Sequence, residues 1–327
     1  MAERDMNISD VSGGSALLQG VERGYVIFGI VAILVLLVAP FVIYPVFVMK
    51  VMCFALFALA FNLLLGYGGL LSFGHAAYYG SAAYITAHTV KEWGLTPELG
   101  LILGALTGAF LGLVFGWLAI RQAGIYFAMV TLAFAQMIYF FALQAPFTGG
   151  EDGIQAVPRG ELFGVISLRP DLTLYYFILV IFLFGFYVVF RTVHSPFGQV
   201  LKAIRENEQR AISLGYRTDH YKLATFVLSA TLSGLAGAAT VFVFQLASLT
   251  YVHWQTSGEV VLMSLLGGMG TLLGPIVGAI LVVTLQTYLA PFGAWITIIL
   301  GAIFVVCVLT FREGIVGVVQ KYLKKPL

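Results

Sequence analysis

Charge is scarce in this sequence. Asp, Glu, Lys and Arg make up 10% of its 327 residues, whereas hydrophobic residues make up 60%. A soluble domain usually has about 25% charged and about 45–50% apolar residues. This much apolar surface cannot be buried in one soluble core of this size. The composition therefore disfavours a soluble enzyme, a disordered protein and a nucleic-acid-binding protein, and it predicts a polytopic membrane protein in a lipid bilayer.

Cysteine and catalytic motifs are scarce as well. The two cysteines, Cys53 and Cys307, lie in separate apolar runs, so we expect neither a disulfide framework nor a zinc site. None of the lysines follows a glycine, which excludes a P-loop for ATP. The sequence also has neither a Gly-x-Ser-x-Gly nor a His-Glu-x-x-His motif. We therefore predict no catalytic residue, no metal ligand and no cofactor in this chain.

Long apolar stretches begin at Tyr25. A membrane-spanning helix needs about 20 residues, and we predict an all-α fold with about ten such helices. Because Gly and Pro interrupt the region 257–311, we divide it into three spans, of which the first is short. Eight or nine spans with a re-entrant segment is the alternative. The predicted spans are residues 25–44, 47–66, 70–89, 100–120, 124–145, 172–191, 222–246, 257–270, 274–289 and 292–311.

The positions of Lys and Arg predict the orientation of the chain, because cytoplasmic loops are enriched in them. The basic segment 192–221 and the basic tail 313–327 are predicted to be cytoplasmic. The loop 146–171 has two more acidic than basic residues and is predicted to be external. An even number of spans across 25–312 then leaves the polar tail 1–24 in the cytoplasm.

The segment from Ser195 to Gly215 has the signals of two short capped helices. Ser195 can cap a first helix that begins with Pro196. Asn207 can cap a second, and Gly215 can end it in the left-handed conformation. A basic loop that only fixes topology is the alternative interpretation. Because such a loop does not need two capped helices, we favour a rod that docks on a cytoplasmic protein.

Two glycine-rich stretches, 66–80 and 267–278, interrupt apolar surroundings. Broken helices are typical of permeation paths, although close packing of helices is an equally ordinary use of small residues. His75 could face such a path, but we expect a hydrogen-bonded structural histidine. The candidate path residues are Asn62, Gly68, Gly69, Ser72, His75, Gly268 and Gly270.

The stretch 148–154 combines glycines with two carboxylates in the predicted external loop. It could bind an external partner or a cation, or it could be a solvated turn. The candidate residues there are Thr148, Gly149, Glu151 and Asp152.

Charged residues are missing near the middle of every predicted span. We place Glu259 at a span edge, as an interfacial anchor. Pumps driven by protons or sodium commonly have carboxylates inside the membrane. Their absence suggests another energy source, or a passive channel.

Five separated motifs together carry a family resemblance, which extends from about residue 25 to about residue 312. They resemble the LivM-type permease subunit of branched-chain amino acid ABC importers. The motifs are residues 62–76, 124–133, 148–154, 195–215 and 267–275.

The resemblance implies a place in the bacterial inner membrane and three kinds of partner. A LivH-like second permease would complete the path, two cytoplasmic ATPase subunits would hold ATP and Mg, and a periplasmic binding protein would deliver substrate. Gln209, Arg210 and Ala211 stand where ABC permeases have Glu-Ala-Ala, Gly215 is kept, and the later Leu-Pro is missing. By this resemblance, the coupling residues are Arg205, Glu206, Asn207, Glu208, Arg210, Ala211 and Gly215.

The cargo stays open at this point. A branched-chain amino acid is the first expectation, and another amino acid, urea or a short amide is the alternative. A self-contained channel or facilitator would need no docking helix, and a scaffold or sensor would use the glycines for packing only.

Overall fold

The computed structural model describes residues 31–293, 295–310 and 314–323. The chain divides into two compact units, residues 1–48 and 49–327. The first unit contains an apolar helix, Val31–Val42, within the predicted span 25–44. The division falls inside the next helix, α2 (Pro45–Asn62), and the second unit contains all the sites considered below.

Helices make up nearly all of the second unit, and they follow the predicted spans closely. The helices that correspond to the predicted spans are α2 (Pro45–Asn62), α3 (His75–Lys91), α4 (Pro97–Ala119), α5 (Ile125–Gln144), α6 (Asp171–Val193), α9 (Thr218–Phe244), α10 (Trp254–Gly267), α11 (Gly274–Leu289) and α12 (Trp295–Thr310). Six segments in the described part are long and apolar enough to cross a membrane. The helices α3, α10 and α12 have 17, 14 and 16 residues, so the count of about ten spans stays a prediction.

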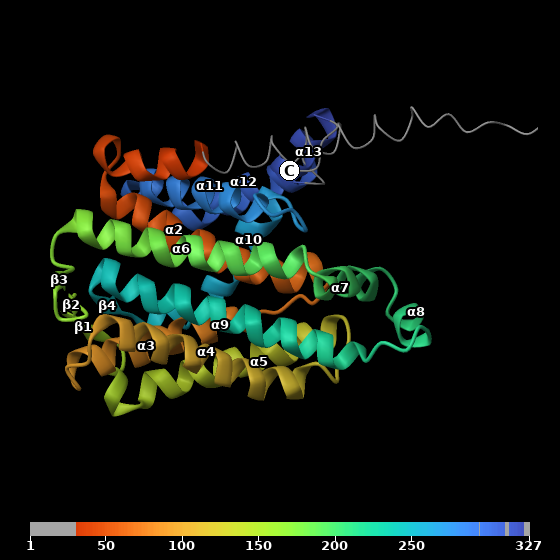
Figure 1. Cartoon of the computed structure of the whole chain (residues 1–327), viewed down its shortest axis with the longest axis horizontal. Coiled ribbons are helices and arrows are strands. Elements are labelled where there is room, and N and C mark those ends of the chain that lie inside the picture. Colours follow the sequence, from red (N-terminus) through yellow and green to blue (C-terminus); the bar gives the residue numbers. More distant parts are fainter. Residues whose placement is uncertain (1–30, 294, 311–313, 324–327) are drawn as a thin grey trace, which may run out of the picture. The chain divides into compact units, whose positions relative to one another are not determined.

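The remaining elements lie at the two ends of these helices (Figure 1). One end has the helices α7 (Pro196–Glu206) and α8 (Glu208–Ser213). The opposite end has four short strands, β1 (Ile154–Gln155), β2 (Glu161–Leu162), β3 (Ile166–Ser167) and β4 (Leu246–Ala247). Strand β1 pairs antiparallel with β4, and β2 pairs antiparallel with β3. A last helix, α13 (Gly314–Leu323), ends the described chain.

Five glycines at every fourth position form one ridge of α4, from Gly100 to Gly116. This ridge packs against α9, beside α3 (Figure 1). A Cβ added at Gly108 would lie 2.5 Å from the Ala230 carbonyl oxygen, and one added at Gly104 would lie 2.7 Å from the Ala238 Cβ. Small residues at this spacing let membrane helices approach closely. We did not predict this contact, although its signal, glycine at every fourth position, is plain in the sequence.

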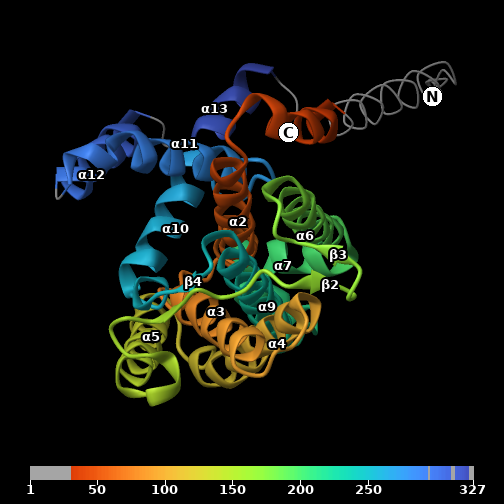
Figure 2. The same ribbon diagram turned by 90° about the vertical axis from the view of Figure 1, so that its left-hand side faces the viewer.

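The helix α2 does not end simply. Its last turns change into a π-helix, Leu63–Tyr67, and the chain then runs without helix until His75. The predicted span 70–89 is therefore wrong at its start, because α3 begins only at His75. A second interruption separates α10, which ends at Gly267, from α11, which begins at Gly274. The two helices are neighbours in Figure 2.

Candidate functional site

The segment between α6 and α9 folds into the two capped helices that the sequence predicts. The Ser195 hydroxyl accepts a hydrogen bond from the Gly198 amide, and Pro196 occupies the first turn of α7. The Asn207 side chain accepts from the Arg210 amide at 3.0 Å and caps α8. Gly215 has a φ of +88°, so it ends this segment as predicted. The helix α8 has six residues.

The helix α8 is fixed to the transmembrane part on one side and exposed on the other. Glu208 forms an ion pair with Lys222 at the start of α9, and Ala211 is buried. Glu206 and Arg210 are exposed. Two apolar side chains join them at the surface, since Ile212 is 47% exposed and Leu214 is 70% exposed. The outer side of α8 thus combines charge with exposed apolar area, a composition suited to contact with another protein.

The two glycine-rich interruptions, far apart in sequence, meet in space. Asn62 is buried at the end of α2. Its Nδ2 donates to the Thr271 carbonyl at 2.9 Å, and its Oδ1 accepts from the Gly270 amide at 3.0 Å. One amide side chain therefore satisfies backbone groups of the second interruption. A Cβ added at Gly66 would lie 2.6 Å from the Gly270 nitrogen, so the two backbones are in close contact.

Arg205 joins this junction to the cytoplasmic helices. From α7, its guanidinium donates a hydrogen bond to the Gly66 carbonyl. A Cβ added at Gly270 would lie 3.1 Å from the same guanidinium, and one added at Gly69 would lie 3.0 Å from the Arg205 Cγ. One side chain of the predicted coupling segment thus contacts both interruptions. We define the break junction as Asn62, Gly66, Gly69, Gly270 and Arg205.

The other predicted path residues have different surroundings. Gly68 packs near the Leu201 side chain of α7, and Gly268, with a φ of +124°, ends α10. The Ser72 hydroxyl accepts from the Gly74 amide at 3.1 Å. The Nε2 of His75 lies 2.8 Å from the Ser229 hydroxyl oxygen. His75 is buried, and it therefore has the surroundings of the structural histidine that we expected.

The predicted external loop is held by its own backbone and by β4. Thr148 is buried and donates to the Ala142 and Ala145 carbonyls. Gly149 has a φ of +77°, and Glu151 and Asp152 are exposed. No group of three His, Cys, Asp or Glu side chains within the described ranges is placed to hold a metal ion. The geometry is that of a tight, solvated acidic turn.

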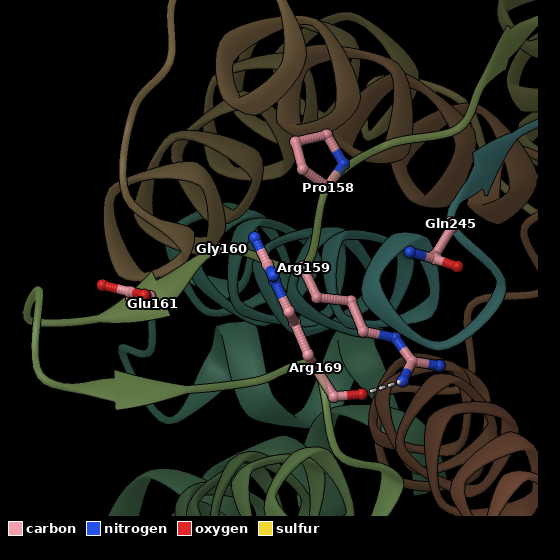
Figure 3. Close-up of a pocket in the computed structure, with 6 residues that line it drawn as sticks. All are labelled: Pro158, Arg159, Gly160, Glu161, Arg169 and Gln245. Atoms are coloured by element: carbon pink, nitrogen blue, oxygen red, sulfur yellow. Dashed lines mark hydrogen bonds between the residues drawn. The ribbon is translucent and has the colours of Figure 1, made fainter.

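A recess of about 490 Å³ lies at the same end of the molecule, lined by Pro158, Arg159, Gly160, Glu161, Arg169 and Gln245 (Figure 3). The Arg159 guanidinium donates to the Arg169 carbonyl at 2.9 Å and pairs with Asp171 at 2.6 Å. Arg169 itself is exposed. The recess thus offers one anchored and one exposed guanidinium, and sequence analysis did not single it out.

Glu259 lies in surroundings that the sequence did not predict. Glu259 does not lie at the edge of its helix, because α10 begins five residues earlier, at Trp254. It is half-buried, and it interacts with Gln286 on α11 and with Lys50 on α2. The only signal in the sequence was one charged or amide residue in each of three apolar stretches, namely Lys50, Glu259 and Gln286.

Comparisons with known proteins agree on one family. The family model described as "Branched-chain amino acid transport system / permease component" matches residues 45–308. The "High-affinity branched-chain amino acid transport system permease protein LivM" of Escherichia coli strain K12 is 28% identical over 97% of this chain and 81% of its own length. The protein of the same name from Salmonella typhimurium strain LT2 is 27% identical over 84% of this chain and 70% of its own length.

More distant relatives are permeases as well. The "Autoinducer 2 import system permease protein LsrC" of Salmonella typhi is 29% identical over 55% of this chain and 50% of its own length. No solved structure matches the chain. The family model covers more than half of the sequence, including both interruptions and the segment that contains α7 and α8. The chain belongs to the branched-chain amino acid transport permease family.

Proposed function

We propose that this chain is one transmembrane subunit of an ATP-driven ABC importer for branched-chain amino acids. A LivH-like permease completes the translocation path, and two ATPase subunits act from the cytoplasm. A periplasmic binding protein delivers the amino acid. The path passes beside the break junction, and the outer side of α8 docks on an ATPase subunit.

The break junction carries this proposal. A helix pair that only docks would need no contact with the interior, and broken helices that only pack would need no contact with the cytoplasmic helices. Arg205 belongs to α7 and contacts both glycine-rich interruptions. A movement of α7 and α8 would therefore displace the ends of α2 and α10. Such a contact supports transmission of ATPase closure to the path, because packed elements have discrete alternative arrangements.

The recess beside the short strands supports the proposal that a binding protein delivers the amino acid from outside. Arg169 is exposed beside the anchored Arg159, and guanidinium groups pair well with carboxylates at protein interfaces. Acidic side chains on the binding protein would complement this recess. The exposed Glu151 and Asp152 would repel a wrongly oriented partner of that charge.

The test is uptake of labelled leucine by cells with and without the gene, challenged with unlabelled valine, alanine, urea and acetamide. Loss of leucine uptake on deletion, competed by valine, is the expected result. Loss of urea or acetamide uptake in place of leucine uptake would change the proposed substrate to that solute. Unchanged uptake of every solute would contradict a transport function.

Docking is tested separately with Arg210→Glu, which reverses one exposed charge on α8. We expect the protein to insert normally while leucine uptake collapses, because the ATPase no longer engages. An exposed arginine with no assigned contact to the ATPase, Arg121, provides the matched control as Arg121→Glu. A self-contained channel would transport equally well with either substitution.

A further inference from the structure

One ion pair attaches α8 to the transmembrane helices. The Lys222 ammonium, in the second turn of α9, pairs with the Glu208 carboxylate in the first turn of α8. Within the described part of the chain, no other side chain of α8 forms a hydrogen bond with α9. The Lys222 side chain is only 11% exposed, and removal of the partner of so buried a charge is costly. The Glu208 carboxylate is therefore engaged within this chain, although the family resemblance assigned it to coupling.

The helix α9 runs without interruption from this ion pair to the opposite end of the molecule (Figure 1). Its 27 residues extend about 40 Å at 1.5 Å per residue. At the far end, Gln245 lines the recess, and its carbonyl accepts a hydrogen bond from the Val157 amide at 3.0 Å. The next two residues form β4, which pairs with β1 of the predicted external loop. One helix therefore joins the recess to α8.

Neighbouring helices enclose the middle of α9. The Ser229 hydroxyl donates to the Ala60 carbonyl of α2, and the Thr240 hydroxyl oxygen lies 2.6 Å from the Tyr79 hydroxyl oxygen of α3. The glycine ridge of α4 packs on a third side of the helix. Densely packed interiors have low compressibility and transmit strain. A displacement of one end of α9 would therefore reach the other end.

We propose that Lys222 is a positioning residue for coupling to the ATPase. Through Glu208, it holds α8 in the orientation that the ATPase subunit binds, and it makes α8 follow the motion of α9. Docking of the binding protein at the recess then changes the ATPase contact at the other end of α9. The inference rests on the proposed import function and adds a route by which external docking stimulates ATP hydrolysis. This route is separate from Arg205, which joins α7 to the break junction.

The experiment uses the assembled transporter in proteoliposomes, with its ATPase subunits and its binding protein. ATPase activity is measured with and without the leucine-loaded binding protein, and the ratio of the two rates is the stimulation. For Lys222→Gln we expect the stimulation to fall about fivefold or more, while the basal rate and subunit assembly persist. Arg121→Gln changes an exposed basic residue outside the segment that contains α7 and α8. It is the matched control and should be stimulated normally.

Two further variants separate positioning from folding. Lys222→Arg keeps the positive charge and should retain most of the stimulation. Exchange of the two charges, with Lys222→Glu and Glu208→Lys in one chain, should restore the stimulation that each single substitution lowers, because only the pair is then intact. These variants decide the question even where Lys222→Gln yields little folded protein.

Three outcomes would overturn the inference. The first is normal stimulation in Lys222→Gln. The second is a folded charge-exchange variant that is stimulated no better than the single variants. The third is a loss of stimulation that follows only a loss of assembled transporter, in Lys222→Gln and in the charge-exchange variant alike, since the ion pair would then be a structural contact alone.

Failure of the import proposal is recognised independently, in the wild type. If the binding protein stimulates no ATP hydrolysis there and the transporter carries no solute, both proposals fall. If the wild type carries leucine with stimulated hydrolysis and Lys222→Gln does so equally well, only the inference about Lys222 falls.

Discussion

The glycines of α4 and those of the break junction differ in backbone conformation and in surroundings. The α4 glycines are helical, and their missing side chains make room for atoms of α9 and α3. Gly270 has a φ of +75° and lies beside a charged side chain from α7. Glycine content alone therefore does not distinguish packing from transport in this protein. The conformation of each glycine and the chemical nature of its neighbours do.

The largest expected effect concerns a glycine of α4, where we assign the glycines to helix packing. Gly108→Val places a branched side chain where the Ala230 carbonyl lies 2.5 Å from the first added carbon. Overpacking of this kind costs about 1–3 kcal/mol or more, so the yield of folded protein and the thermal stability in detergent should fall. Gly301→Val on α12, where an added Cβ meets nothing within 4 Å, should leave both unchanged. Equal losses of folded protein and thermal stability in the two variants would contradict a special packing role for the α4 glycines.

In the break junction, Asn62→Ala removes the side chain that links the two interruptions. It leaves the Gly270 amide and the Thr271 carbonyl without that partner, at a cost of about 1–3 kcal/mol for buried groups. We expect a moderate loss of thermal stability and a larger loss of leucine uptake per folded molecule. Gln144→Ala, an exposed amide at the end of α5, should change neither quantity. An Asn62 variant with normal uptake per folded molecule would contradict the role of the junction.

A third change separates coupling from stability. Arg205→Ala removes the hydrogen bond from α7 to the Gly66 carbonyl. Because the rest of the side chain is exposed, the free energy of unfolding should fall by only about 1 kcal/mol. Uptake should fall roughly tenfold, which corresponds to a coupling free energy of about 1.4 kcal/mol. Arg121→Ala removes an equally exposed arginine that stacks on Trp117, and it should transport normally. Parallel measurement of ATPase activity would show whether hydrolysis continues without transport.

The smallest effect is expected at a helix cap. Asn207→Ala removes the side-chain hydrogen bond to the Arg210 amide, and loss of such a cap costs about 1 kcal/mol. The amides of α8 should then exchange faster with solvent, while those of α4 exchange as before. Gln209→Ala, on the exposed side of the same helix, should leave exchange unaltered. Faster exchange throughout the chain would mean that α8 is not an independent local unit.

Local signals predicted much of this structure. Ser195, Asn207 and Gly215 act through hydrogen bonds and a backbone angle within a few residues of themselves, so the two helices between α6 and α9 could be predicted from the sequence. The approximate positions of the spans could be predicted as well, because apolar length depends only on neighbours in the chain. The start of α3 could not, since apolar residues continue through the non-helical residues before His75.

Contacts between distant segments were not available to the same reasoning. Asn62 and Gly270 are 208 residues apart, and nothing local specifies that they meet. Arg205 was predicted as a docking residue, and the structure turns it inward to the Gly66 carbonyl. In each case the missing information was which helices pack together.

The most direct test of the account compares Gly270→Ala with Gly108→Ala, each assayed for leucine uptake per folded molecule and for the yield of folded protein. We expect Gly270→Ala to lower uptake per folded molecule, because its left-handed φ and its contact with Arg205 belong to the coupling path. Gly108→Ala should lower the yield and leave the uptake of each folded molecule intact. Normal uptake per folded molecule in Gly270→Ala would contradict the account, because the interruptions would then serve packing alone.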